Sequence, residues 1–281
     1  GVLIGGITQL GFQIPFLRKI KRLPKLQFGP HKSLLILRKR MLPALFGVSV
    51  SQINLLVDTM IASTLIAGSV SWLYYSDRLL ELPLALIGIA LAIVALAKLS
   101  NYHAKKDTTN FISTIDKALL YAILLGLPAC AGLVLLSEEL IITLFQYDAF
   151  DASSAKKTSL SLKAYGSGLM AFIAIKIFAP IFLSRGDTKT PVKAGVVAMV
   201  SNIVLNLMLV QYYDHVGLAA ATSISALINA AILYFYLIKQ SIFKFHITFY
   251  KMLVKVIFAV IIMALYIDYF DSSIELYLES S

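Results

Sequence analysis

The sequence has few charged residues and almost no cysteine. Charged residues make up 14% of its 281 residues, whereas a typical soluble domain has about a quarter. The one cysteine, Cys130, excludes a disulfide within the chain and a cysteine-based metal site. We find no Ser/His/Asp arrangement, no phosphate-binding glycine loop and no nucleotide motif. The sequence therefore gives no support for an enzyme.

Apolar residues, at 59% of the chain, lie mostly in runs of about the length that crosses the hydrocarbon core of a bilayer. These runs predict an all-α, polytopic membrane protein. We expect seven transmembrane helices, with boundaries good to a few residues, at 42–66, 76–97, 116–137, 160–184, 190–212, 216–238 and 250–270.

Lysine and arginine are concentrated in alternate loops. Nine lie in 18–40 and four in 98–117, whereas 67–75 and 211–216 contain none. This is the positive-inside pattern, and it places the start of the first span in the cytoplasm. The same pattern accounts for the net charge of +10, so nucleic acid is not an expected partner.

The regions outside the spans suggest how the chain is organised. Gly1–Leu10 reads like the end of a helix that began earlier, so we expect the chain to be a fragment of a larger protein. The basic linker either lies on the inner leaflet as an interfacial segment or is a solvated loop. The expected parts are a preceding helix end (1–15), the linker (16–40), a six-helix lobe (42–238), an additional transmembrane helix (250–270) and a periplasmic tail (271–281).

Asp58 is the clearest polar residue at membrane depth, about 12 Å from the outer end of its span at 1.5 Å per residue. Such groups usually face a cavity or a partner. Asn202 and Asn206, on one helix face, and Thr222 fall in the same depth band. One carboxylate with neutral oxygens suits a monovalent hard cation such as Na⁺. Alternatively, the amides and the hydroxyl join helices by hydrogen bonds.

A second group of charges opens the span 76–97. Arg78 and Glu81 are three residues apart and can pair on one helix face, with Asp77 beside them. Arg78 is suited to bidentate phosphate binding. Alternatively, it is an interfacial anchor next to an aromatic belt that includes Trp72. Lys176 either snorkels to the cytoplasm or meets an anionic ligand.

Several strings resemble the MurJ (MviN) lipid II flippases of bacteria, and the resemblance covers essentially the whole chain. The strings around Trp72 and after Asp187 are specific; the apolar spans between them are not. They are residues 47–54 (GVSVSQIN), 68–79 (GSVSWLYYSDRL), 144–150 (LFQYDAF), 176–180 (KIFAP) and 187–193 (DTKTPVK).

The resemblance implies the second six-helix lobe of a multidrug/oligosaccharidyl-lipid/polysaccharide exporter fold, plus one extra C-terminal helix. It also implies a multi-pass protein of the bacterial inner membrane, with lipid II, membrane lipids and a missing N-terminal lobe as partners. Arg78, Asp77, Glu81 and Lys176 are the substrate-binding candidates that follow. Asp58, Asn202, Asn206 and Thr222 match a sodium-site pattern that the family shows in some members.

The function expected from this resemblance is flipping of lipid II by alternating access, driven by Na⁺ or by the membrane potential. No other cofactor is expected. Two alternatives remain at this point. One is another exporter of the same fold, either a drug/cation antiporter or a polysaccharide-lipid flippase. The other is a non-transporting membrane scaffold for cell-wall enzymes, although a scaffold gains nothing from a carboxylate in the membrane.

Overall fold

A computed structural model describes residues 2–21, 23, 49, 52–242 and 247–279. The chain divides into two compact units, residues 1–41 and 42–281, which we describe separately. Most of the expected linker, and the start of the first expected span, lie outside the described residues. The question of an interfacial or a solvated linker therefore stays open.

The first unit contains helix α1 (Val2–Lys19), which ends on Arg18 and Lys19. The helix runs past residue 15, where we expected it to end, and Pro15 lies inside it. Its first residues are apolar and largely exposed within the unit. An apolar surface of this kind suits lipid or another part of the protein.

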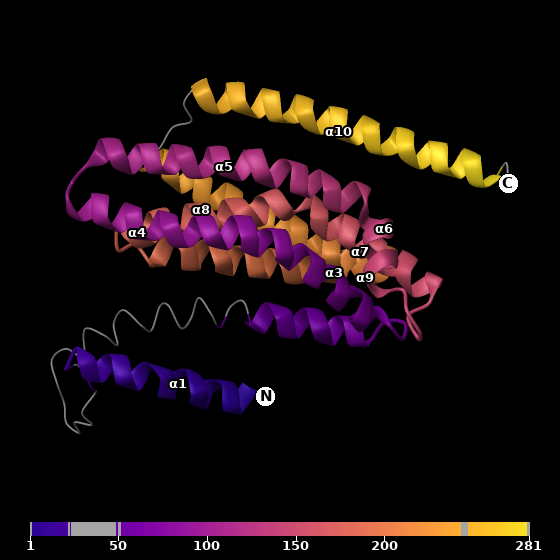
Figure 1. The fold of residues 1–281 in the computed structure, drawn as a ribbon, viewed down its shortest axis with the longest axis horizontal. Helices are drawn as coiled ribbons and strands as arrows, with labels where there is room; N and C mark the ends of the chain where they lie inside the picture. Colours follow the sequence, from indigo (N-terminus) through magenta and orange to yellow (C-terminus); the bar gives the residue numbers. More distant parts are fainter. Residues whose placement is uncertain (1, 22, 24–48, 50–51, 243–246, 280–281) are drawn as a thin grey trace. The chain divides into compact units, whose positions relative to one another are not determined.

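The second unit is a bundle of helices (Figure 1). Its first described helix covers residues 52–63. The remaining elements are α3 (Ser69–Pro83), the π-helix η1 (Leu84–Ile89), α4 (Ala90–Ala104), α5 (Thr108–Leu135), α6 (Ser137–Phe145), α7 (Ala152–Ser167), α8 (Leu169–Ser184), α9 (Lys189–Lys239) and α10 (Ile247–Glu279).

Four helical stretches of the described residues are long and apolar enough to cross a membrane: Ser69–Ala104, Thr108–Leu135, Lys189–Lys239 and Phe249–Phe270. The bent pair α7 and α8 adds a fifth. The difference from seven expected spans has two causes. The first span is described only from residue 52, and two expected spans lie within α9.

Helix α9 is a hairpin of two antiparallel arms rather than one rod. Asp214 has φ 47° and ψ −132°, which is not helical. Asn202 Nδ2 lies 3.2 Å from Thr222 Oγ1, although twenty residues of straight helix would separate the two by about 30 Å. The arms, 189–213 and 215–239, coincide with two of the expected spans.

The α9 hairpin is tight at its tip. A Cβ on Gly217 would lie 2.5 Å from the carbonyl oxygen of Leu209. Glycine therefore permits the second arm to approach the backbone of the first.

The expected span 160–184 is broken at Gly168, where α7 and α8 meet at 41°. A Cβ on Gly168 would lie 2.6 Å from Ser223 Oγ in the second arm of α9. Ser223 Oγ donates a hydrogen bond of 2.7 Å to the carbonyl of Ala164. A helix break at membrane depth needs such a partner for its freed backbone groups, and Ser223 supplies it.

Three prolines, Pro83, Pro128 and Pro180, lie inside the expected spans. Proline removes a backbone donor and can kink or end a helix. Helix α5 continues through Pro128 and α8 continues through Pro180. Pro83 ends α3, and the wider turns of the π-helix η1 follow directly. Of the three, only Pro83 adjoins a change of helix type.

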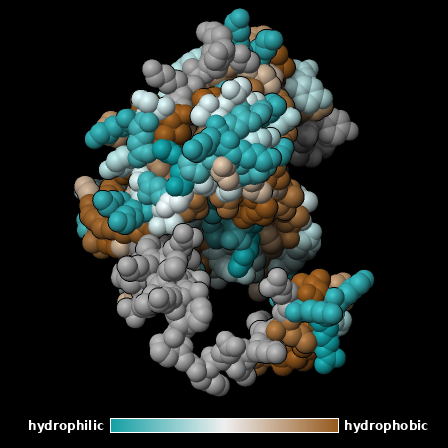
Figure 2. All heavy atoms as spheres, turned by 90° about the vertical axis from the view of Figure 1, so that its left-hand side faces the viewer, coloured by the Kyte–Doolittle hydropathy of each residue, from teal (hydrophilic) through white to brown (hydrophobic). Residues whose placement is uncertain are grey.

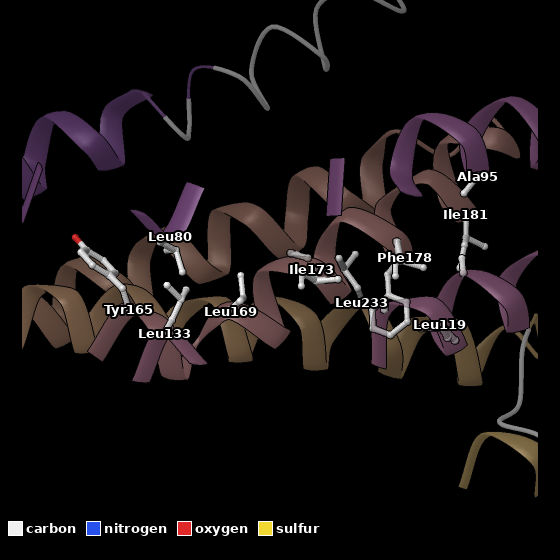
Figure 3. Packing of buried hydrophobic residues seen from close by; sticks show 14 of the residues in the cluster. Leu80, Ala95, Leu119, Leu133, Tyr165, Leu169, Ile173, Phe178, Ile181 and Leu233 are labelled. Atoms are coloured by element: carbon white, nitrogen blue, oxygen red, sulfur yellow. The ribbon is translucent and has the colours of Figure 1, made fainter. Parts of the chain in front are cut away.

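The core of the second unit is apolar and lies between α3, α4, α5, α7, α8 and α9. Figure 3 shows a row of packed side chains running from Leu133 and Leu169 past Ile173 to Ile181. Ile173 and Ile181 are fully buried. Many large apolar side chains outside this row are exposed, as expected for helices that face lipid.

The end of the bundle with the α4–α5 connection is polar. Figure 2 shows hydrophilic side chains gathered over this end, with apolar ones along its margin. The basic loops 98–117 and 185–193 belong to it. At the second loop, Asp187 Oδ1 accepts hydrogen bonds from the backbone nitrogens of Lys189 and Thr190, each at 3.0 Å, and caps α9.

Candidate functional site

Asp58, on helix 52–63, is joined to the first arm of α9. Asn206 Nδ2 donates to Asp58 Oδ1 at 2.5 Å. Asn54, one helical turn before Asp58, donates from Nδ2 to Asp58 Oδ2 at 3.2 Å. Both carboxylate oxygens therefore accept an amide N–H. Asp58 is half-buried, whereas Asn206 is fully buried.

Asn202 and Thr222 extend this network across the α9 hairpin. Asn206 Nδ2 also donates to Asn202 Oδ1 at 2.8 Å, and Asn202 Nδ2 lies 3.2 Å from Thr222 Oγ1. Turning the Asn202 amide over places its nitrogen 3.0 Å from Asp58 Oδ1. We call Asn54, Asp58, Asn202, Asn206 and Thr222 the polar cluster.

The donor set of the polar cluster fits a small hard cation. Asn206 Oδ1 is buried and accepts no hydrogen bond within the described part of the chain. An unpaired buried acceptor costs about 1–3 kcal/mol, which a cation ligated by that oxygen would offset. Each amide presents an oxygen after a half-turn, so amide, hydroxyl and carboxylate oxygens can all face one ion. A single carboxylate favours charge +1 over +2.

The described residues offer no set of ligands for a transition metal. Within residues 2–21, 52–242 and 247–279, no three His, Cys, Asp or Glu side chains lie together in a way that could hold a metal ion. A transition-metal centre normally draws on such nitrogen, sulfur and carboxylate ligands. The polar cluster, built mostly from amides, is suited to a different ion.

A pocket of about 250 Å³ adjoins the polar cluster, and we call it the outer pocket. Its lining includes Asn54, Asp58 and Thr222, together with Asp77 from α3 and Tyr165 from α7. Tyr165 lies at one end of the packed row in Figure 3, and its hydroxyl points away from the apolar residues. Two carboxylates and a phenol thus face one small space, an arrangement that attracts cations.

Arg78 lies on the exposed side of α3 and is already paired. Its Nη1 lies 2.6 Å from Glu81 Oε2, and about half of each side chain is exposed. The guanidinium also lies 4.8 Å from the centre of the Tyr74 ring. The expected pairing of Arg78 with Glu81 is therefore present. Because the pair is exposed, an anion can reach the guanidinium from solvent.

Lys176 lies elsewhere, on α8, and its side chain is exposed. Its Cγ passes 3.5 Å from where a Cβ of Gly88 would lie, so its stem packs on the π-helix η1. The structure therefore places Asp77 in the lining of the same pocket as Asp58, pairs Arg78 with Glu81, and puts Lys176 against η1. Asp77, Arg78 and Glu81 share one helix, whereas Lys176 comes from another.

Trp72 is not part of an exposed aromatic belt, and that interpretation is wrong for this residue. Its side chain is buried. Its ring lies 4.9 Å from the ring of His215 and beneath the Lys157 ammonium, at 4.4 Å. Trp72 thus packs α3 against the tip of the α9 hairpin. Tyr74, by contrast, is exposed.

Sequence reasoning overlooked two residues of this region. Asn54 was recoverable, because it lies four positions before Asp58 and so on the same helix face. Tyr165 was not, because one tyrosine in an apolar span looks like any other core residue. Only the packing of α7 against α3 brings it to the outer pocket.

Comparisons of sequence place this arrangement among known proteins. Residues 1–280 match the family model described as lipid II flippase MurJ. A probable lipid II flippase MurJ of Vibrio cholerae is 50% identical over 235 residues, covering 83% of this chain and 45% of that protein. Its counterpart in Haemophilus influenzae is 43% identical, covering 96% of this chain and 54% of that protein.

Solved structures agree. A lipid II flippase MurJ in an inward closed conformation matches with a TM-score of 0.73 at 29% identity, covering 91% of this chain and 54% of that one. An outward-facing multidrug resistance MATE transporter of the MOP superfamily matches with a TM-score of 0.65 at 16% identity, covering 81% of this chain and 53% of that one. The second likeness shows a shared fold. The chain spans about half the length of these relatives.

Proposed function

Because the chain belongs to the MurJ family of lipid II flippases, we propose that it is the C-terminal part of a transporter of lipid II. The transporter moves this peptidoglycan precursor from the inner to the outer leaflet of the bacterial cytoplasmic membrane by alternating access. The rest of the protein supplies a second lobe, and the substrate head group binds between the two.

The polar cluster is the observation that supports transport driven by a cation. In this proposal its oxygens hold Na⁺, with Asp58 supplying the charge and Asn202, Asn206 and Thr222 supplying neutral ligands. Bound Na⁺ neutralises the carboxylate, so Asn206 no longer needs to donate to it. Binding therefore exchanges hydrogen bonds between helix 52–63 and the first arm of α9 for bonds to a shared ion.

Such an exchange can shift the equilibrium between two conformations of the transporter. A cation that crosses the membrane potential contributes about 2.3 kcal/mol per 100 mV. Conformations of a transporter that differ by a few kcal/mol respond to a change of this size. Helix 52–63 carries Asp58 and lies next along the chain to α3, which carries Arg78. The cation thus acts close to the helix that we assign to the substrate.

Arg78 is the residue that we assign to the anionic pyrophosphate of the substrate. Its guanidinium binds phosphate oxygens bidentately, while Glu81 and the Tyr74 ring hold it in place. Lys176, exposed on α8 and packed against η1, is assigned to the same substrate from a different helix. Asp77 faces the outer pocket instead. We therefore place it between the cation and the substrate residues.

Growth and binding together test this function. The full-length gene is expected to restore growth to cells depleted of their own lipid II flippase, and the purified full-length protein to bind labelled lipid II. A panel of cationic drugs serves as the comparison. Tight binding of the drugs without binding of lipid II would favour a drug/cation antiporter. Failure to restore growth, with neither ligand bound, would favour a scaffold for cell-wall enzymes.

A further inference from the structure

The polar cluster lies between two pockets, and it forms part of the wall of both. Besides the outer pocket, a pocket of about 410 Å³ lies between α8 and the two arms of α9, and we call it the inner pocket. Asn54 and Thr222 line both pockets. Among the described lining residues, it is therefore the polar cluster that separates the two pockets at this point.

The two pockets lie toward opposite sides of the membrane. The outer pocket is lined by Ala62 and Val70, next to the loop without basic residues. The inner pocket is lined by Pro191 and Val192, in the first turn of α9, just after the basic residues Arg185 and Lys189. Positive loops face the cytoplasm, so the inner pocket lies on the cytoplasmic side of the polar cluster.

The inner pocket offers neutral oxygens in a row. Thr222, Ser225 and Asn229 all line it, and their spacing of three and four residues puts them on one face of the second arm of α9. Asn229 Oδ1 is buried and has no hydrogen-bond partner in the described part of the protein. The described lining of this pocket contains no charged side chain, in contrast to the two carboxylates of the outer pocket.

We propose that the inner pocket is the path by which the coupling cation leaves the polar cluster for the cytoplasm, with Asn229 Oδ1 as its intermediate ligand. The inference rests on the proposed sodium site and adds a direction and a residue to it. Conduction needs sites that bind strongly enough to admit an ion and weakly enough to release it. A carboxylate followed by neutral oxygens provides that order, because each step inward lowers the charge that holds the ion.

Access of a charged thiol reagent tests whether the inner pocket opens to the cytoplasm. The test uses full-length protein in inside-out vesicles, with Cys130→Ala and no other native cysteine. A Cβ on Gly195 meets nothing within 4 Å, so Gly195→Cys fits into this pocket. Val197→Cys, two residues further on and about half exposed on the outside of the bundle, is the matched control.

A membrane-impermeant cationic thiosulfonate is expected to modify Gly195→Cys at least about tenfold faster than Val197→Cys, because charged reagents are excluded from hydrocarbon. Equal rates, or modification of Gly195→Cys only from the outer side, would overturn the path.

Sodium release tests the role of Asn229. In Asn229→Leu, radioactive sodium is expected to leave the protein about tenfold more slowly, because the leucine removes the intermediate oxygen. Leu227→Ala, on the exposed side of the same helix, is expected to release sodium at the wild-type rate. An unchanged rate in Asn229→Leu, or the same slowing in both variants, would overturn the assignment.

The thermal shift of the wild-type protein in Na⁺ against K⁺ separates the two proposals. A wild type that sodium stabilises, combined with an unreactive Gly195→Cys, leaves the sodium site standing and removes the inner path. A wild type that sodium does not stabilise removes both.

Discussion

Asp58 and Asn206 are 148 positions apart in the sequence, and a hydrogen bond from Nδ2 to Oδ1 joins them across two helices. The amide donates to the carboxylate, while its own oxygen, Oδ1, accepts no hydrogen bond from any residue that the structure describes. A bound cation would favour the opposite orientation of the Asn206 amide, because a cation binds oxygens rather than N–H groups. The pair is therefore the natural place to look for an effect of sodium.

Asp58→Ala is expected to abolish the stabilisation of the full-length protein by Na⁺ relative to K⁺. A ligand at a hundred times its Kd stabilises a protein by about 2.7 kcal/mol, and the wild type should show a shift of this order. Thermal unfolding in detergent, followed in both salts, measures it. Asp107→Asn, at the N-cap of α5, should keep the full shift. A sodium shift that survives in Asp58→Ala would show that the ion binds elsewhere.

Arg78→Ala is expected to leave flippase-depleted cells unable to grow while the protein still inserts and accumulates normally. The alanine removes the guanidinium that we assign to the pyrophosphate, and it leaves only an exposed carboxylate, Glu81, behind. Growth curves alongside membrane immunoblots measure both properties. Leu82→Ala, an exposed neighbour on the same helix, is the control and should grow normally. Normal growth of Arg78→Ala would return the arginine to an anchoring role.

Gly168→Ala is expected to destabilise the protein by about 1–3 kcal/mol, the usual cost of overpacking. The added methyl group would lie within 3 Å of Ser223, including its Cα, so α7, α8 and α9 would have to separate. Gly132→Ala in α5 meets nothing within 4 Å, and the higher helix propensity of alanine should leave stability equal or better. Thermal unfolding of both variants decides the matter: equal midpoints would show that the junction is loosely packed.

The cap of α9 is expected to weaken in acid. Partial burial raises the pKa of Asp187, but hydrogen bonds from Thr190 and Lys189 outweigh it, so the net effect is to lower the pKa. A carboxyl whose folded pKa is lowered stabilises the protein above the unfolded pKa, about 3.9, and loses that effect as the pH falls through the folded pKa.

Asp187→Ala tests this cap and should cost about 1 kcal/mol at neutral pH. In acid its stability should converge on that of the wild type. Unfolding midpoints measured between neutral pH and pH 3 give the comparison. Two parallel curves would indicate that the carboxylate contributes no pH-dependent stability.

Regular geometry explains why the sequence predicted as much as it did. Helix rise is constant and loop charge gives direction, so counting residues from the outer ends placed Asp58, Asn202, Asn206 and Thr222 at one depth. The structure brings these four side chains together. Their role as sodium ligands stays a prediction. Arg78 and Glu81 were equally accessible to reasoning, because their pairing depends only on spacing within one helix.

Features that depend on contacts between distant segments were missed. The break at Gly168 arises where Ser223 approaches the backbone, and nothing near Gly168 in the sequence indicates that approach. Trp72 looked like an interfacial aromatic, whereas packing against His215 buries it. In each case a partner far away in the sequence decides the outcome.

The reversal at Asp214 has a consequence for biogenesis. Because the two arms of α9 are joined at one non-helical residue, neither arm can reach its place in the bundle without bringing the other with it. The pair is fixed by the close approach of Gly217 to the backbone of Leu209. Substitutions at this tip should therefore show themselves as failed insertion and rapid degradation, well before any defect in transport can be measured.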